Sequence, residues 1–177
     1  MDAVASGTAD GLRLAFNVAA MLIVFIAFVA MFDGVLGLVS TQWISSLTGW
    51  ELPPKITLQW IFGCLFSPVA FLMGVATEDQ AKVGSLLGSK LAINEHYAYL
   101  QLKTWKETAG FMSDRSYQLA AFALTGFANF SSVGIQLGGI GALAPERRAD
   151  LARLGMSALF VGFTATLLNA AIAGLLL

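Results

Sequence analysis

The feature of this sequence that most limits its fold is a nearly unbroken apolar run close to its beginning. Residues 14–31 are almost all apolar, and the apolar character resumes over residues 35–39. A helix that crosses a membrane needs about 20 such residues. Residues 1–40 are therefore predicted to form one long transmembrane helix. At about 1.5 Å per residue, Arg13 and Asp33 would lie about 30 Å apart, so each charge could reach an opposite interface.

The composition also indicates that lipid surrounds much of the chain. Hydrophobic residues make up 57% of the 177 residues, charged residues only 12%, and the mean hydropathy is +0.74. Soluble domains carry about 25% charged residues. The net charge of −1 provides no basic face for a nucleic acid. Cys64 and His96, each the single residue of its type, lack metal-ligand spacing, and no activated nucleophile motif is visible. The sequence predicts an all-α membrane protein that is not an enzyme and holds no metal.

A polar loop and a second apolar stretch make up residues 41–77. Residues 41–55 contain Trp43 and Trp50, and tryptophan at the end of a span is typical of a membrane interface. Residues 57–75 are apolar but are interrupted by a glycine and a proline. This stretch could cross the bilayer or lie along its surface, and the sequence leaves both placements open.

The next segment, residues 78–102, is predicted to be a re-entrant helical hairpin. It opens with three charged residues, and its apolar pieces, residues 83–87 and 91–93, are far too short to span a bilayer. Non-helical backbone survives at membrane depth only where protein or a water-filled cavity covers it. We expect the tip of the hairpin near residues 88–95.

Residues 117–143 are long enough to cross a membrane, but their centre is unsuited to a continuous helix. Residues 126–134 read Gly-Phe-Ala-Asn-Phe-Ser-Ser-Val-Gly, and such small and polar residues predict a broken helix with two halves. Ser131 and Ser132 are expected to cap the second half, because a hydroxyl accepts hydrogen bonds from free backbone N–H groups.

A charged loop then leads into a final span at residues 151–177. A discontinuous helix that faces a re-entrant hairpin is the usual construction of a transporter site at the membrane midplane. Residues 78–177 are therefore predicted to form a substrate-binding unit, and residues 1–40 a scaffold.

Glu95, at the predicted hairpin tip, is the leading candidate for a functional residue. An uncompensated charge at the bilayer centre costs roughly 3 kcal/mol or more, so such residues are rarely kept without a role. A carboxylate accepts two hydrogen bonds at once, which suits a pair of adjacent sugar hydroxyls. The structural alternatives are an ion pair with Lys90 and a position close to the interface.

Asn129 and Ser132 lie three residues apart at the predicted helix break and could face one cavity. Phe127 and Phe130 flank Asn129, so one ring could stack on a planar ligand. The alternative is that Asn129 and the serines only satisfy the interrupted backbone while the phenylalanines pack. If the functional interpretation holds, Glu95 and Asn129 meet across a shared, wet pocket.

Several motifs resemble those of one family. Residues 88–99 read G-S-K-L-A-I-N-E-H-Y-A-Y, which resembles the concentrative nucleoside transporter signature G-x-K-x-x-x-N-E-F-V-A-Y. Residues 126–132 resemble that family's second characteristic segment, and residues 11–18 and 140–155 agree as well. The resemblance runs through the whole chain in the right order and is to the C-terminal half of the bacterial nucleoside permease type.

This resemblance implies secondary active transport of nucleosides by symport with sodium or protons. Glu95, Asn129 and Ser132 would bind ribose, Phe127 would lie near the base, and Asn94 and His96 are candidates for supporting roles. The resemblance also implies a multi-pass homotrimer in the cell membrane, expected to be a bacterial inner membrane. It implies no catalytic residue and no cofactor besides the coupling ion.

Two departures from the family pattern carry further expectations. His96 and Tyr97 replace the Phe-Val of the signature, and we hypothesise that His96 tunes the pH dependence of transport. The second departure is length, because the inverted-repeat first half, which would supply the sodium ligands, is missing from 177 residues. The chain could be a fragment, a partner of a separate N-terminal half, or a remnant. The alternative function is a non-transporting membrane fragment or assembly module that retains the fold.

Overall fold

The computed structural model describes residues 1–38, 41, 45–46, 49 and 52–177. Trp43 and Trp50 lie outside these residues, so their interfacial location stays a prediction. All regular secondary structure in the described ranges is helical, which confirms the all-α class. The helices are α1 (Asp2–Leu36), α3 (Leu58–Leu72), α4 (Gln80–Ala92), α5 (Glu95–Glu107), α6 (Asp114–Ala123), α7 (Phe130–Leu143) and α8 (Arg148–Gly174), with short 3₁₀ turns η1 (Thr77–Asp79) and η2 (Pro145–Arg147).

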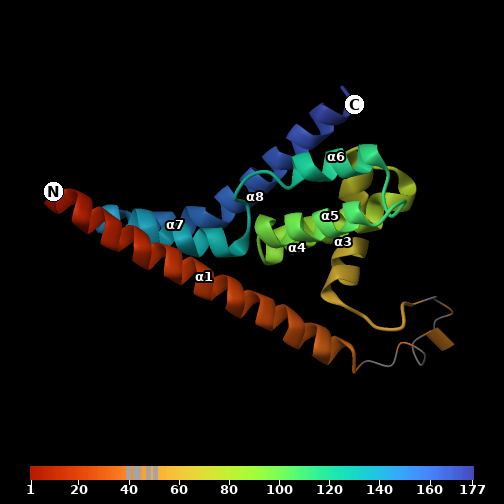
Figure 1. The fold of residues 1–177 in the computed structure, drawn as a ribbon, viewed down its shortest axis with the longest axis horizontal. Coiled ribbons are helices and arrows are strands. Elements are labelled where there is room, and N and C mark those ends of the chain that lie inside the picture. The colour runs from red at the N-terminus through yellow and green to blue at the C-terminus, as the bar shows by residue number, and fades with distance from the viewer. Residues whose placement is uncertain (39–40, 42–44, 47–48, 50–51) are drawn as a thin grey trace.

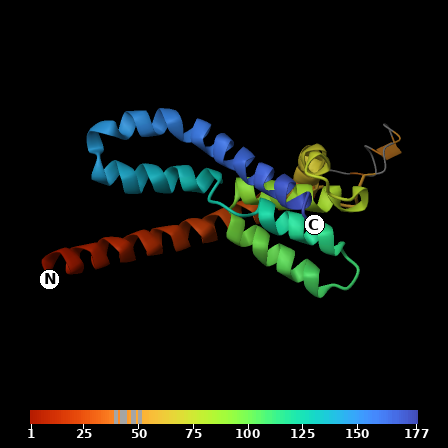
Figure 2. The ribbon, with the colours of Figure 1, turned by 90° about the horizontal axis from the view of Figure 1, so that it is seen from above.

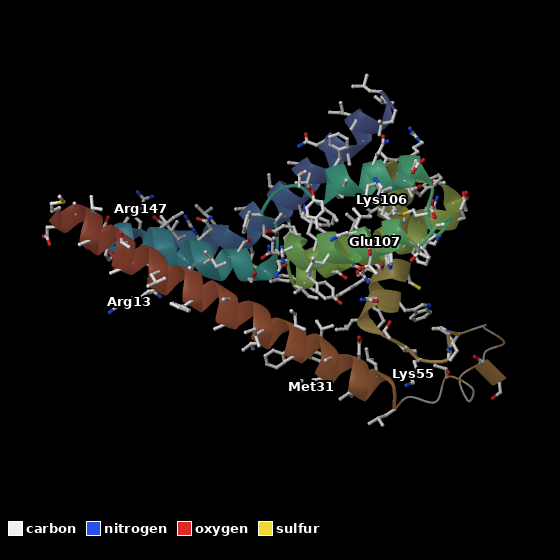
Figure 3. All side chains as sticks on the ribbon, viewed as in Figure 1. Arg13, Met31, Lys55, Lys106, Glu107 and Arg147 are labelled. Carbon is white, nitrogen blue, oxygen red and sulfur yellow. The ribbon has the colours of Figure 1, made fainter. Side chains whose placement is uncertain are left out.

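Helix α1 is the longest element and stands largely apart from the others. Its 35 residues extend about 50 Å, and Figure 2 shows it separated from α7 and α8. Arg13 and Met31 project from α1 into space that no other helix occupies (Figure 3). Its main contact is with the beginning of α3, where Asp33 Oδ1 accepts a hydrogen bond of 2.7 Å from the N–H of Leu58. This carboxylate satisfies one of the free N–H groups in the first turn of α3.

Among the described residues, one helix is long and apolar enough to cross a membrane. It is Pro145–Gly174, which joins η2 to α8 and has a mean hydropathy of 1.7. Helix α3 is apolar but has only 15 residues, or about 22 Å, against a hydrocarbon core of about 30 Å. Length therefore favours a partial or surface placement for α3.

Helices α3 and α4 pack with their backbones in direct contact, and glycines make this approach possible. A Cβ atom on Gly84 would lie 2.8 Å from the Gly63 carbonyl oxygen and 2.9 Å from the Ser67 nitrogen. A Cβ on Gly88 would lie 2.2 Å from the Phe62 side chain. Helix α4 consequently sits at the centre of the helical cluster in Figure 1, and Leu86 is among its fully buried residues.

The chain reverses direction between α4 and α5, which lie side by side (Figure 1). Ile93 ends α4 and Asn94 caps α5, so the turn falls within the predicted tip. Residues 124–129 separate α6 from α7, and Gly126 there has a φ of +83°, which favours glycine. Helix α7 then runs outward and α8 returns beside it (Figures 1 and 2). That this hairpin re-enters a bilayer and that the helix breaks within one stay predictions.

The close approach of α3 and α4 predicts that Gly84→Ala destabilises the protein. The added methyl group meets backbone atoms that cannot rotate away, so the helices must separate, at a cost of roughly 1–3 kcal/mol. The measurement is the thermal unfolding midpoint in detergent micelles. Gly34→Ala is the matched control, because nothing lies within 4 Å of its new methyl group. Equal midpoints for both variants would contradict this view of the interface.

Candidate functional site

The tip of the α4–α5 hairpin touches the start of α7. Asn129 Nδ2 donates a hydrogen bond of 2.8 Å to Glu95 Oε2, although the two residues are 34 positions apart in the chain. Glu95 is the first residue of α5, and Asn129 is the N-cap of α7. The two side chains meet, as expected, through a direct hydrogen bond. The shared, wet pocket between them stays a prediction. The role in binding that the sequence suggested for them stays a prediction.

Asn129 holds the first turn of α7 in place. Its Oδ1 accepts from the N–H of Ser132 at 2.7 Å and from the hydroxyl of Ser131 at 2.6 Å. The Ser132 hydroxyl in turn accepts from the N–H of Asn129 at 3.3 Å, which completes a capping box. The expectation that Ser131 and Ser132 cap this helix is therefore wrong in its assignment, because the cap is Asn129. Ser132, three residues after the cap, makes the return hydrogen bond of the capping box.

This geometry bears on the structural alternative for Asn129 and Ser132. Both residues do satisfy the interrupted backbone, as that alternative states. The capping role uses only the oxygen of the Asn129 amide, however, and its nitrogen is directed to Glu95. One amide thus links the helix cap to the hairpin tip, and Asn129 is 1% exposed.

Only one of the two oxygens of the Glu95 carboxylate is engaged by the described residues. Its Oε1 has no hydrogen-bond partner among the described residues, while Oε2 is bound by Asn129. The carboxylate lies in the first turn of α5 and beside the N-cap of α7, where the partial positive charges of both helices stabilise an anion. The alternative of an ion pair with Lys90 is wrong, since the Lys90 ammonium donates instead to two carbonyls and a hydroxyl.

Phe127 and Ser132 border a separate hollow beside the helix break. This pocket has a volume of about 260 Å³ and lies between the break, α7 and α8. Phe127 is 74% exposed, so its ring is free to contact another molecule. Glu95 does not line this pocket; the Asn129–Ser132 capping box connects the two sites. The structure therefore brings the predicted residues together as two adjoining pairs.

The two supporting candidates differ in their environment. Asn94 is buried, and its Oδ1 accepts from the N–H of Tyr97 at 2.9 Å, which caps α5. Its amide nitrogen has no partner in the described part of the chain. His96 is exposed and makes no hydrogen bond or ion pair with any described residue.

Two contacts near the tip were not anticipated. Gln59 Nε2 donates to the Tyr97 hydroxyl at 3.1 Å, which connects α3 to α5, and Tyr99 donates to the Ala121 carbonyl at 2.7 Å. Such contacts carry no sequence signal, because one partner is a backbone atom or an ordinary polar side chain. The described residues contain no group of three or more His, Cys, Asp or Glu side chains that could hold a metal ion.

Comparison with known proteins identifies the class to which this fold belongs. Residues 1–174 match the family model described as the C-terminus of the Na⁺-dependent nucleoside transporters. The chain therefore belongs to this family of membrane transporters, which confirms both the resemblance seen in its motifs and the expectation that it is not an enzyme.

The relatives are longer than this chain. It is 42% identical to an uncharacterized transporter of Haemophilus influenzae, over 99% of this chain and 41% of the relative. It is 38% identical to the putative nucleoside permease NupX of Escherichia coli, over 98% of this chain and 40% of the relative. It is also 38% identical to pig sodium/nucleoside cotransporter 1, over 99% of this chain and 28% of the relative. The chain thus spans about two fifths of these bacterial relatives.

Solved transporter structures have the same fold. CNTnw in an inward-facing substrate-bound state is 40% identical and superposes with a TM-score of 0.82, over 98% of this chain and 40% of CNTnw. A CNTnw variant in an outward-facing state gives a TM-score of 0.80. The helical arrangement described above is therefore the one found in the matching part of CNTnw.

The two roles of the Asn129 amide can be separated by substitution. Asn129→Ser keeps a side chain that caps helices well but removes the bond to Glu95, whereas Asn129→Leu removes both. Loss of an N-cap costs about 0.5–2 kcal/mol. We expect Asn129→Leu to lower the thermal unfolding midpoint clearly more than Asn129→Ser. Equal losses would show that the cap contributes nothing measurable to stability.

Proposed function

We propose that this chain supplies the ribose-binding half of the substrate site in a cation-coupled nucleoside transporter. The proposal rests mainly on one observation, the hydrogen bond of 2.8 Å between Glu95 and Asn129 that leaves Glu95 Oε1 unpaired. A carboxylate oxygen that is held in position and still free can accept a charge-assisted hydrogen bond from a sugar hydroxyl. Membership of a nucleoside transporter family makes a nucleoside the appropriate ligand.

The neighbouring residues complete the proposed half-site. Asn129 has a second amide hydrogen beyond the one directed to Glu95, and Ser132 borders the adjacent pocket. The exposed ring of Phe127 offers a flat apolar surface for a nucleobase. Asn94 has an unpaired amide nitrogen beside Glu95, which fits a supporting role.

The position of the site in the membrane follows from physical requirements. We place the α4–α5 hairpin as a re-entrant element and the α6–α7 interruption as a broken helix, both near the midplane. The hairpin and α8 cover the part of the interruption around Ala128 and Asn129. Residues 125–127 are exposed in this chain, so their backbone would need cover from other protein or from a water-filled cavity. In this arrangement α1 belongs to a static scaffold, and residues 78–177 form the substrate-binding unit.

Other parts of the transporter are proposed by membership of the family. The remaining substrate contacts and the ligands of the coupling ion, sodium or a proton, would come from sequence outside this chain, which spans about two fifths of its bacterial relatives. We further propose a homotrimer in a bacterial inner membrane, with an N-terminal half as partner. The same incomplete coverage favours one alternative, a non-transporting assembly module, which predicts no uptake under any condition.

Glu95→Gln tests the role of the carboxylate. The chain is co-expressed with the N-terminal part of NupX in cells without nucleoside uptake of their own, and uridine uptake is measured. A hydrogen bond to a charged group contributes about 1.5–3 kcal/mol, so KM should rise roughly ten- to a hundredfold. Glu107→Gln, an exposed acid on the same helix, is the matched control. An unchanged KM in Glu95→Gln, with both halves inserted, would exclude this role.

His96→Phe tests the hypothesis that His96 tunes pH dependence. Histidine changes its charge near neutral pH, and an imidazolium next to Glu95 would alter the field at the carboxylate. We expect the uptake-versus-pH profile of His96→Phe to be flatter than that of wild type. Superimposable profiles would remove the hypothesis but leave the proposal for Glu95 intact.

A further inference from the structure

Lys90, in the last turn of α4, is the largest fully buried side chain among the residues that the structure describes. Its Nζ donates three hydrogen bonds: 2.9 Å to the Ala123 carbonyl, 2.8 Å to the Thr125 carbonyl and 2.9 Å to the Thr166 hydroxyl. These acceptors come from the end of α6, the α6–α7 interruption and α8. One side chain of the hairpin therefore joins three other parts of the fold.

The three contacts of Nζ fit the charged form of Lys90. The Thr166 hydroxyl also lies 2.8 Å from the Phe163 carbonyl, and when it donates there it accepts from Lys90. Three acceptors require three hydrogens on Nζ, and only the ammonium form carries three. No carboxylate oxygen lies within 4.0 Å of Nζ in the described ranges. Oxygen dipoles and the Phe163 ring, whose centroid lies 5.6 Å from Nζ, surround the ammonium in place of an ion pair with a described residue.

The C-terminal end of α6 explains why a cation is suited to this position. The last four carbonyls of a helix lack helical partners. At the end of α6, the backbone N–H groups of Leu124 and Thr125 donate to the carbonyls of Ala120 and Phe122. The Tyr99 hydroxyl donates to the Ala121 carbonyl, and the Lys90 ammonium donates to the Ala123 carbonyl. The partial negative charge of this helix end attracts a cation. Two of the four partners, Tyr99 and Lys90, come from the two arms of the hairpin.

The hairpin thus presents opposite charges to the two ends of the interruption. Lys90 lies at the negative end of α6, and Glu95 lies at the positive end of α7. Carbonyl groups at the ends of interrupted helices commonly coordinate alkali cations in transporters. Here a covalently attached ammonium takes that position.

We propose that Lys90 is a tethered cation that fixes the end of α6 and thereby positions Asn129 opposite Glu95. It is a positioning residue and does not touch the substrate. Its effect on transport rests on the proposed function of Glu95 and Asn129, whereas its effect on the α6–α7 interruption does not. Lys90 also makes an added alkali cation unnecessary at this helix end.

Hydrogen exchange on the full chain in lipid nanodiscs tests the positioning without any substrate. Lys90→Met keeps most of the apolar stem but removes the three bonds. Amide exchange over residues 124–132 should become at least tenfold faster, with exchange in α1 unchanged. Lys103→Met, an exposed lysine on the same hairpin, should match wild type. Wild-type exchange at residues 124–132 in Lys90→Met, or a uniform increase in all helices, would overturn the proposal.

Two further variants keep the test decisive if Lys90→Met fails to fold. Thr166→Val removes one acceptor at constant shape and should accelerate exchange in the same segment by a smaller factor. In Lys90→Ala, added n-propylammonium replaces the missing atoms and should restore slow exchange, whereas n-propanol should not. Equal restoration by both compounds would show that Lys90 only fills space, and would overturn the proposal.

The uptake assay separates this proposal from the proposed function. Lys90→Met should raise KM for uridine at least tenfold, and Lys103→Met should leave it unchanged. A lower maximal rate with an unchanged KM would contradict a positioning role. If wild type shows no uptake but the exchange pattern is as expected, the proposed function fails and the assignment of Lys90 stands.

Discussion

The structure depends on one constraint: an interrupted helix must find partners for its free backbone groups away from bulk water. Unpaired buried N–H and C=O groups are costly, and this cost rises sharply in an apolar environment. The α4–α5 hairpin contributes polar partners at both ends of the interruption. Lys90 and Tyr99 donate to the end of α6, while Asn129 caps α7 and is itself held by Glu95. The contacts that satisfy the free backbone groups are therefore the same contacts that position the residues of the proposed site.

The remaining elements keep the hairpin in a fixed position. Glycines bring α4 against α3 so closely that the two helices share backbone contacts, and α3 is in turn bonded to α1 through Asp33. On the opposite side, Thr166 of α8 accepts from Lys90, and its methyl group fills the space that a Cβ on Gly126 would need. A rigid hairpin allows Glu95 to hold its geometry before any ligand binds, which reduces the ordering cost of binding.

Much of the fold near the site could be predicted because its signals are local. Short apolar pieces and a charged opening predicted the hairpin, and the observed turn at Ile93 and Asn94 lies within the expected tip. Small and polar residues predicted an interruption, and the gap between α6 and α7 overlaps it. The meeting of Glu95 with Asn129 was expected because a hairpin tip commonly faces a broken helix in a transporter site. The partners of Lys90 could not be predicted, since backbone carbonyls have no sequence signature. The true cap of α7 was missed because Asn, Ser and Ser are all good caps.

The central claim is that Glu95 and Asn129 form one wall of a nucleoside site. The most direct measurement is an experimental structure of the assembled transporter with bound uridine. The claim predicts ribose hydroxyl oxygens at about 2.5–3.0 Å from the Glu95 carboxylate, with the Asn129 amide against the same sugar. A nucleoside bound elsewhere, or a Glu95 side chain directed toward the lipid chains, would contradict it.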